Sequence, residues 1–151
     1  MTYPPLDITA HWSRLNDGLI RLVDHIPGDK LNWSPRPDLW NLRGILAHVA
    51  TGRHTWMTRD VQDGETSPDV LRDVQMKDDL KRHLQASWER MLRFLSDPAK
   101  LATTYTSIHE PYSITGHWIA FHGLEHDIHH RADIFHYLAL LGIEHPDVGT
   151  P

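Results

Sequence analysis

The 151-residue sequence contains no cysteine. This absence excludes disulfide bridges, thiolate metal sites and a cysteine nucleophile, so a bound metal ion would need imidazole and carboxylate ligands. The sequence also has no run of 18 apolar residues. Residues 1–5 lack the basic segment followed by an apolar segment that is typical of a secretory signal. We therefore expect a cytoplasmic protein that does not enter a membrane.

Basic residues are also fewer than acidic residues. The chain has 15 Lys and Arg residues against 20 Asp and Glu residues, which gives a formal net charge of -5 at pH 7. Such a chain lacks the electrostatic footprint for a phosphate backbone, so nucleic acid is not expected as a partner. With 40% hydrophobic and 23% charged residues the composition is that of a folded protein, and the length indicates a single domain over residues 1–151.

The spacing of apolar residues predicts four long helices. They run from about Ile8 to Val23, from the cap Asn41 to about Asp60, from Met76 to Leu95, and from the cap Thr115 to Leu141. Ser67-Pro68 and the region near Gln75 are alternative starts for the third helix. Residues 100–114 show no helical period and predict a long loop with room for a short hairpin. The expected fold class is all-α, a four-helix bundle.

Histidine, in contrast, is abundant, with 13 residues that gather mainly between His109 and His145. In the predicted last helix His122, His126 and His130 are spaced by four, which places them on one face within roughly 80° of arc. Two imidazoles at this spacing can bind one metal ion, but a site with an open position normally has three protein ligands. The third ligand would have to come from another helix.

His48 is the leading candidate for that third ligand. It lies beside the apolar stripe of the second predicted helix, and Gly44 and Gly52 leave room on either side for a facing helix. A histidine in this position is also often a hydrogen-bonded core residue, so spacing alone leaves a metal site and a core histidine about equally open. His122 either belongs to the metal face or lines the pocket.

Asp133 shares the helical face of His130 and follows it by three residues. Its carboxylate could orient a ligand imidazole, join the ligands or form an ion pair with a Lys or Arg elsewhere. His129 points about 100° away from His130 and is left out of the site.

The opposite face of the same predicted helix is apolar. It carries Phe121, Leu124, Ile128, Phe135 and Leu138. A helix with two such faces must bury both, so it is expected to lie centrally in the bundle or to meet a partner subunit.

The tryptophans at positions 12, 40, 56, 88 and 118 are expected mainly in the core, and Trp40 is also a candidate to line the pocket.

Two other cofactor sites fit the pattern less well. A di-iron carboxylate bundle is excluded, because it needs E-x-x-H motifs and Glu125 is followed at that spacing by Ile128, and because the second predicted helix has no inward-facing Glu. Haem ligation by a bundle histidine stays open, although three converging histidines favour a small ion.

Three segments resemble the DinB/YfiT-like superfamily in order and spacing over nearly the whole chain. They are Trp40-Asn-Leu-Arg-Gly-Ile-Leu-Ala-His48, Glu125-His-Asp-Ile-His-His-Arg-Ala-Asp133 and Leu141-Gly-Ile-Glu-His-Pro146. The resemblance implies an up-down four-helix bundle, often dimeric, with one divalent metal ion on the histidines that match His48, His126 and His130. The chain departs from the family where Gly-Gln usually follows His-His-Arg, because Ala132-Asp133 stands there.

Known members of this superfamily include bacillithiol-dependent S-transferases, mycothiol-dependent isomerases and proteins described as metal-dependent hydrolases. The expected function is that of a metal enzyme, in which a Zn or Ni ion on neutral histidines activates water or a low-molecular-weight thiol cosubstrate. The activated group would attack an electrophilic small molecule, and neither the choice between thiol transfer and hydrolysis nor a catalytic residue follows from the sequence. The alternative is a non-catalytic metal-binding stress-response protein.

Overall fold

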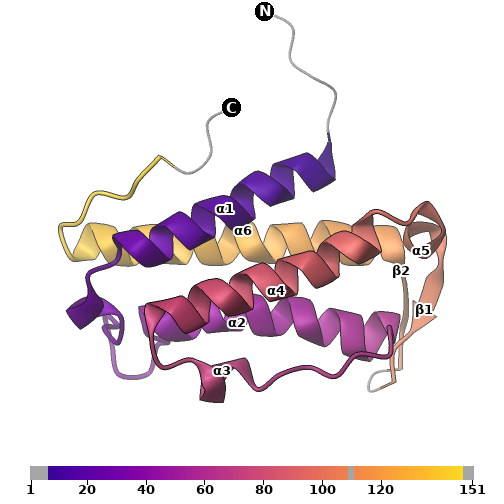
Figure 1. The fold of residues 1–151 in the computed structure, drawn as a ribbon, viewed down its shortest axis with the longest axis horizontal. Coiled ribbons are helices and arrows are strands. Elements are labelled where there is room, and N and C mark those ends of the chain that lie inside the picture. Colours follow the sequence, from indigo (N-terminus) through magenta and orange to yellow (C-terminus); the bar gives the residue numbers. More distant parts are fainter. Residues whose placement is uncertain (1–6, 109–110, 148–151) are drawn as a thin grey trace, which may run out of the picture.

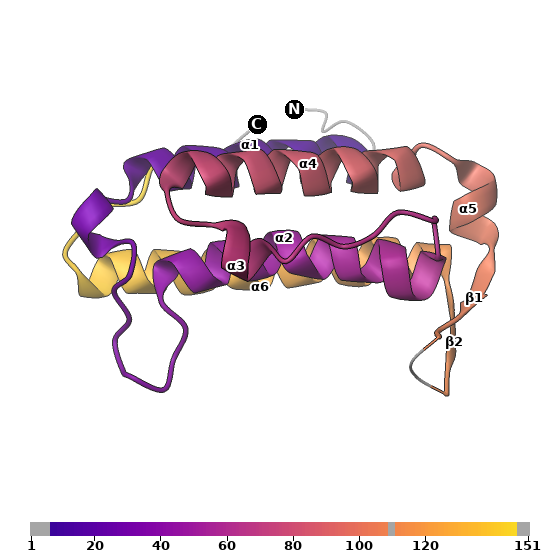
Figure 2. The ribbon, with the colours of Figure 1, turned by 60° about the horizontal axis from the view of Figure 1, so that its bottom comes forward.

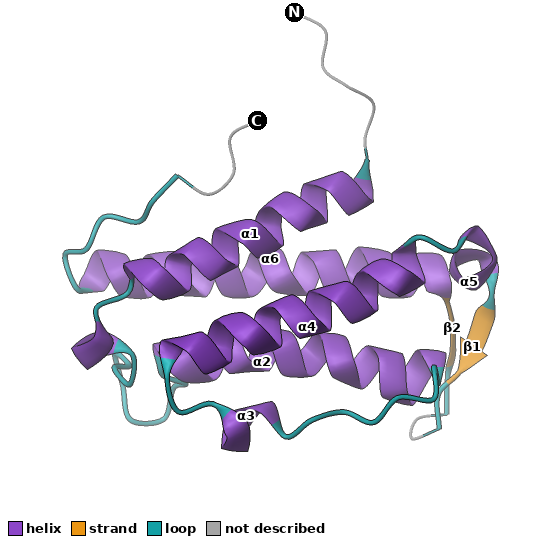
Figure 3. Cartoon of the chain, viewed as in Figure 1, coloured by secondary structure: helices purple, strands orange, loops and turns teal. Residues whose placement is uncertain are grey.

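The computed structural model describes residues 7–108 and 111–147, which are mostly helical (Figure 3). Residues 1–5, on which the expectation about a secretory signal rests, and His109 lie outside this described part. The long helices α1 (Ile8–His25), α2 (Leu42–Thr55), α4 (Lys77–Leu95) and α6 (Gly116–Leu140) lie side by side (Figure 1). Figure 2 shows α1 and α4 in one layer and α2 and α6 in the other. None of the described helices has the length and apolar character needed to cross a membrane.

Shorter elements connect the long helices. They are the 3-10 turn η1 (Gly28–Lys30), the π-helical turn η2 (Trp56–Val61) that continues α2, the helices α3 (Val70–Asp73) and α5 (Pro98–Ala102), and the strands β1 (Thr104–Thr106) and β2 (Ser113–Thr115). The two strands form an antiparallel hairpin in which Tyr105 pairs with Ile114. The segment predicted as a long loop therefore holds the end of α5 and a short hairpin.

Local capping chemistry explains two of the predicted helix starts. Asn41 Oδ1 accepts a hydrogen bond from the backbone N–H of Gly44, and Thr115 Oγ1 accepts one from the N–H of Trp118. At the other end of α6, Gly142 has a φ of 71°, a left-handed conformation that glycine adopts without strain. These contacts lie within a few residues of one another, which is why the sequence could predict them.

The third long helix starts at the later of the two predicted positions. Asp79 reaches back and accepts hydrogen bonds from the backbone N–H groups of Gln75 and Met76, both at 3.0 Å. A carboxylate in the first turn also interacts favourably with the helix dipole. The region after Ser67-Pro68 forms only the short helix α3, with Asp69 as its cap.

The long helices do not alternate strictly in direction. α1 and α2 are antiparallel, and so are α4 and α6, whereas α2 and α4 run the same way (Figure 2). Segment 62–76 runs back along the molecule from the end of α2 to the start of α4. Consistent with this path, Arg43 near the start of α2 donates to the carbonyl of Val74, and Lys77 at the start of α4 donates to the carbonyl of Asp24 near the end of α1. The observed helix directions therefore differ from the expected up-down order at α2 and α4. The reason is that segment 62–76 is long enough to return from the end of α2 to the end of the molecule where α2 begins.

An apolar core lies between the two layers. Its largest fully buried side chains include Trp12, Leu15, Leu19, Leu22, Leu42, Leu46, Met57, Leu80, Leu84 and Met91. Trp56 and Trp88 are also buried, as expected, whereas Trp40 and Trp118 are 48% and 47% exposed. Trp40 and Trp118 are therefore free to take part in surface or pocket contacts.

α6 does not lie at the centre of the molecule, and its buried side differs from the predicted apolar face. Of that face Leu138 is buried and Leu124 and Phe135 are partly buried, but Phe121 and Ile128 are exposed. The helix instead turns Gly123 and Asp127 toward the core. A Cβ atom on Gly123 would lie only 2.6 Å from the ring of Trp12, so the close approach of α6 depends on this glycine.

A buried polar cluster joins the end of α2 to α4. The Arg90 guanidinium donates to Asp63 and Thr58, and its Nη1 lies 3.2 Å from Nδ1 of His54. A guanidinium has no acceptor, so this His54 nitrogen must accept and the ring is neutral. Burial, together with the positive charges of Arg90 and its neighbours, lowers the pKa of His54 to about 4.

We expect the free energy of unfolding to fall as the pH is lowered from 6.5 to about 4. In this interval the unfolded chain binds a proton at His54 and the folded chain does not, so the stabilisation is complete above the unfolded pKa and is lost toward the folded one. His54 contributes about 3 kcal/mol to this loss at most. Urea denaturation in the presence of a chelator, repeated over this pH range, measures the slope.

His54→Gln serves as the matched variant for this experiment. Its side-chain oxygen can still accept from Arg90, but the titrating group is gone, so its stability should depend less steeply on pH. His48, His83 and His130, whose pKa values are also lowered by burial, contribute equally in both proteins. Equal slopes for the two proteins would show that His54 is not the group responsible.

Candidate metal centre

His48 of α2 and His126 and His130 of α6 come together between these two helices. One ring nitrogen of each residue lies within 4.8 Å of the corresponding nitrogens of the other two. The Nε2 atoms of His48 and His126 are 3.0 Å apart, and the ring centroid of His130 lies 4.8 Å from that of His48 and 4.5 Å from that of His126. Two nitrogens on one tetrahedral ion are separated by about 3.3 Å at usual metal–nitrogen distances. The spacing of this imidazole group therefore fits a shared ion.

The charge state of the group also suits a metal ion. Burial, followed by the neighbouring His126 and His130, lowers the pKa of His48 to about 4. Burial and His126 likewise lower the pKa of His130. Both rings are therefore neutral at pH 7, and the neutral imidazole is the form that binds metal ions.

Both candidate ligands on α6 contact a carboxylate through Nδ1. His126 Nδ1 lies 3.2 Å from Asp127 Oδ1, and His130 Nδ1 lies 3.1 Å from Asp133 Oδ2. Carboxylates in this position fix the orientation and tautomer of a ligand histidine. Asp133 thus makes the contact with His130 that the orienting role, one of those left open by the sequence, requires.

The sequence did not indicate Asp127 as a site residue, although it is held more firmly by hydrogen bonds than Asp133. It is fully buried and accepts hydrogen bonds from Trp12 Nε1 at 2.6 Å and from Arg53 Nε at 2.8 Å. Arg53 is fully buried too, and its Nη1 donates to Asn16 Oδ1 at 2.7 Å. The sequence signal was an aspartate adjacent to a candidate ligand on one helix, with an arginine available on the facing helix. This network ties the orientation of His126 to the packing of the core.

Gly52 supplies the space that His126 occupies. A Cβ atom at this position would lie 3.0 Å from Cε1 and 3.4 Å from Nε2 of His126. The glycine predicted to let a facing helix approach is therefore in contact with one of the three imidazoles, whereas Gly44 lies next to Asn41 and Trp40.

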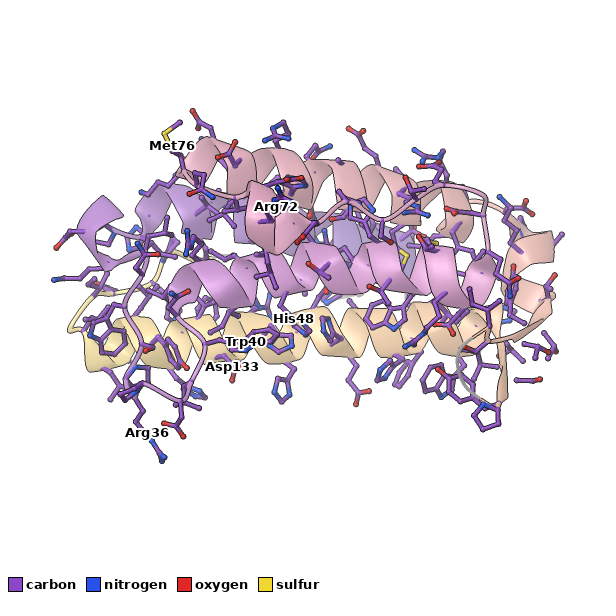
Figure 4. The ribbon with its side chains drawn as sticks, turned by 90° about the horizontal axis from the view of Figure 1, so that it is seen from below. Arg36, Trp40, His48, Arg72, Met76 and Asp133 are labelled. Carbon is purple, nitrogen blue, oxygen red and sulfur yellow. The ribbon has the colours of Figure 1, made fainter. Side chains whose placement is uncertain are left out.

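Two cavities open beside the three histidines, and His130 lines both. The larger, about 450 Å³, is lined mainly by Trp40, Ile45, Tyr137 and Asp133. Figure 4 shows Trp40, His48 and Asp133 close together at the α2–α6 boundary, and the Trp40 and His48 ring centroids are 4.3 Å apart. Trp40 is therefore a pocket residue.

The smaller cavity, about 270 Å³, also borders His130 and is further lined by His122, Glu125, His126 and His129. His122 stacks on Trp118 with ring centroids 4.5 Å apart and does not belong to the group of three converging histidines. His122 therefore lines the smaller cavity.

Comparisons with known proteins agree with this fold. A sequence model described as the DinB family matches residues 1–151, while no curated protein matches the chain. Similar solved structures include a DinB-like protein from Bacillus subtilis, with a TM-score of 0.71, 19% identity and 95% of each chain covered. Another is a DinB-like protein from Bacillus cereus, with a TM-score of 0.72, 14% identity, and 93% of this chain and 95% of that chain covered. At these identities the likeness concerns the fold.

Proposed function

Because the chain belongs to the DinB family, we propose that it is a divalent-metal-dependent enzyme whose ligands are His48, His126 and His130. The observation that carries the proposal is the convergence of these three imidazoles beside an open cavity. We take the four long helices to be the four-helix bundle of this family, formed as one domain by residues 1–151. A bound Zn or Ni ion would lower the pKa of a water molecule or of a low-molecular-weight thiol and would so supply the nucleophile for an electrophilic small molecule.

The residues of the chain have separate tasks in this proposal. Asp127 and Asp133 hold two of the imidazoles in position through their Nδ1 atoms. Trp40, Ile45 and Tyr137 give the larger cavity an apolar wall, which suits the hydrocarbon part of an electrophile and excludes water from it. A cytoplasmic location is part of the proposal, since thiol cosubstrates are kept reduced there.

Turnover measurements with a panel of electrophiles test the proposed function. The protein is assayed with and without added thiols, after loading with Zn²⁺ or Ni²⁺ and after chelation, with His48→Ala as the matched variant. Metal-dependent product formation that also requires thiol supports an S-transferase, and metal-dependent formation without thiol supports a hydrolase. Tight metal binding without turnover across the panel would contradict the enzyme and favour the non-catalytic metal-binding stress-response protein.

Asp133→Asn is expected to weaken metal affinity by about 10-fold to 100-fold, the usual range for loss of a carboxylate that orients a ligand histidine. The neutral amide is a poorer acceptor for His130 Nδ1. Competition with a chromophoric chelator measures the affinity. Asp38→Asn is the control, because Asp38 borders the same cavity but pairs with Arg36. Equal affinities for Asp133→Asn and the wild type would make Asp133 an ordinary surface carboxylate.

We also propose that the protein is a homodimer. Side chains of α6 leave considerable apolar surface exposed, with Trp118 at 47%, Phe121 at 61% and Leu140 at 67%. A second copy that covers this surface would remove it from water. Sedimentation at micromolar concentration is expected to give a species of twice the 17.5 kDa chain mass, and Phe121→Ser should shift it toward the monomer. A wild-type protein that sediments only as a monomer would rule out the dimer.

A further inference from the structure

A second group of potential metal ligands lies on α6 next to the first. His129 Nε2 and His130 Nδ1 lie 3.7 Å and 3.1 Å from the same oxygen of Asp133, Oδ2. One donor atom from each of these three residues lies within 4.8 Å of the others. The helical spacing placed His129 outside the predicted site, because this residue points away from His130. Asp133 nevertheless reaches both, since it follows them by four and by three residues, one helical turn.

We propose that His129, His130 and Asp133 form a second, outer divalent-metal site that shares His130 with the inner site of His48, His126 and His130. The inner site in this statement rests on the proposed function. The outer donors are two imidazole nitrogens and one carboxylate oxygen, a set that suits Zn²⁺, Ni²⁺ or Cu²⁺ better than Mg²⁺ or Ca²⁺.

The exposure of the two donor groups differs sharply. The side chains of His129 and Asp133 are 72% and 38% exposed, whereas those of His126 and His130 in the inner group are 15% and 18% exposed. The outer site is therefore open to solvent, and water molecules can complete its ligand set from the adjoining smaller cavity. Because exposed side chains lose conformational entropy when they are ordered around an ion, the outer site binds more weakly than the inner one.

The position of His130 allows it to serve both donor groups. Its Nδ1 faces Asp133, while its ring packs against those of His48 and His126, which leaves Nε2 for the inner group. An imidazole that binds ions through both nitrogens has lost its ring N–H proton. Filling the outer site therefore releases this proton to solvent and replaces the hydrogen bond between His130 and Asp133 with metal ligation.

The outer site has a consequence for the inner one. Asp133 lines the larger cavity, His129 the smaller one and His130 both, so an ion held by these three residues would border both cavities. It also withdraws Asp133 from its orienting contact with His130. Excess divalent metal is thereby expected to obstruct the centre that the first equivalent creates.

Calorimetric titration of chelator-stripped protein with Zn²⁺ alone tests the outer site. The wild type is expected to show two binding events per chain, with the second at least about 10-fold weaker than the first. His129→Ala should lose only the second event, and because the His129 side chain is exposed, its removal leaves the core packing unchanged. His136→Ala, an exposed histidine two turns further along α6, is the control that should retain both events.

The outcomes separate the two sites. A single event in the wild type, or a second event that survives in His129→Ala, would overturn the outer site and leave the inner one untouched. Loss of the first event in His48→Ala is expected from the inner site, and its persistence would contradict the proposed function whatever happens at His129. Titrations in two buffers of different ionisation enthalpy add a readout for His130: the second event should release at least one proton, and a second event without proton release would contradict the shared imidazole.

Discussion

Asp127→Ala is expected to lower the free energy of unfolding by about 3–5 kcal/mol, the usual cost of leaving one charge of a buried pair without its partner. In the wild type, Asp127 lies beside the fully buried Arg53 and accepts the indole N–H of Trp12. The alanine variant leaves the guanidinium without a counter-charge and the indole without an acceptor. Urea denaturation of the metal-free protein at pH 7 measures the loss.

A double variant separates the buried charge from simple loss of packing. Arg53→Met combined with Asp127→Leu removes both charges and keeps most of the volume, so it should be more stable than Asp127→Ala. A loss below about 1 kcal/mol in Asp127→Ala would mean that the pair does not hold α6 in place. The same variant should also bind metal less tightly, because His126 loses the group that orients it.

His48→Ala is expected to reduce metal affinity by more than about 100-fold, beyond the range found when only an orienting group is lost. His48 is the one candidate ligand that α2 contributes to the group of three, so its loss leaves both remaining imidazoles on α6. Competition with a chelator of known affinity measures the change, and circular dichroism confirms that the helices are retained.

His122→Ala is the matched control for this prediction. It lies one turn before His126 on α6 and lines a neighbouring cavity, but it stacks on Trp118 instead of joining the group of three. Its affinity should stay close to that of the wild type. If His122→Ala lost as much affinity as His48→Ala, the ligand assignment would be wrong.

The features that the sequence predicted well depend on local contacts. The starts of α2 and α6 follow from Asn41 and Thr115, whose side chains cap backbone groups three residues away. His126 and His130 share a face because of their spacing of four. His48 could be added because a glycine four residues away pointed to a close helix contact, which Gly52 makes with His126.

The features that the sequence did not predict depend on contacts between distant segments. Apolar spacing gives no weight to Gly123 or Asp127, yet both face the core, because Gly123 admits the Trp12 ring and Arg53 neutralises Asp127. The buried side of α6 was therefore misplaced. The parallel run of α2 and α4 depends on the path of segment 62–76, which no periodicity encodes. His129 was set aside because a helical wheel ignores the reach of Asp133.

The most direct test of the account is the metal content of protein purified without chelator and dialysed to remove weakly held ions. Elemental analysis compares the wild type with His126→Ala, in which one of the three converging imidazoles is missing. The account predicts close to one divalent ion per chain in the wild type and loss of most of it in the variant. Equal metal content in the two proteins, or a wild type that neither retains nor takes up a divalent ion, would contradict it.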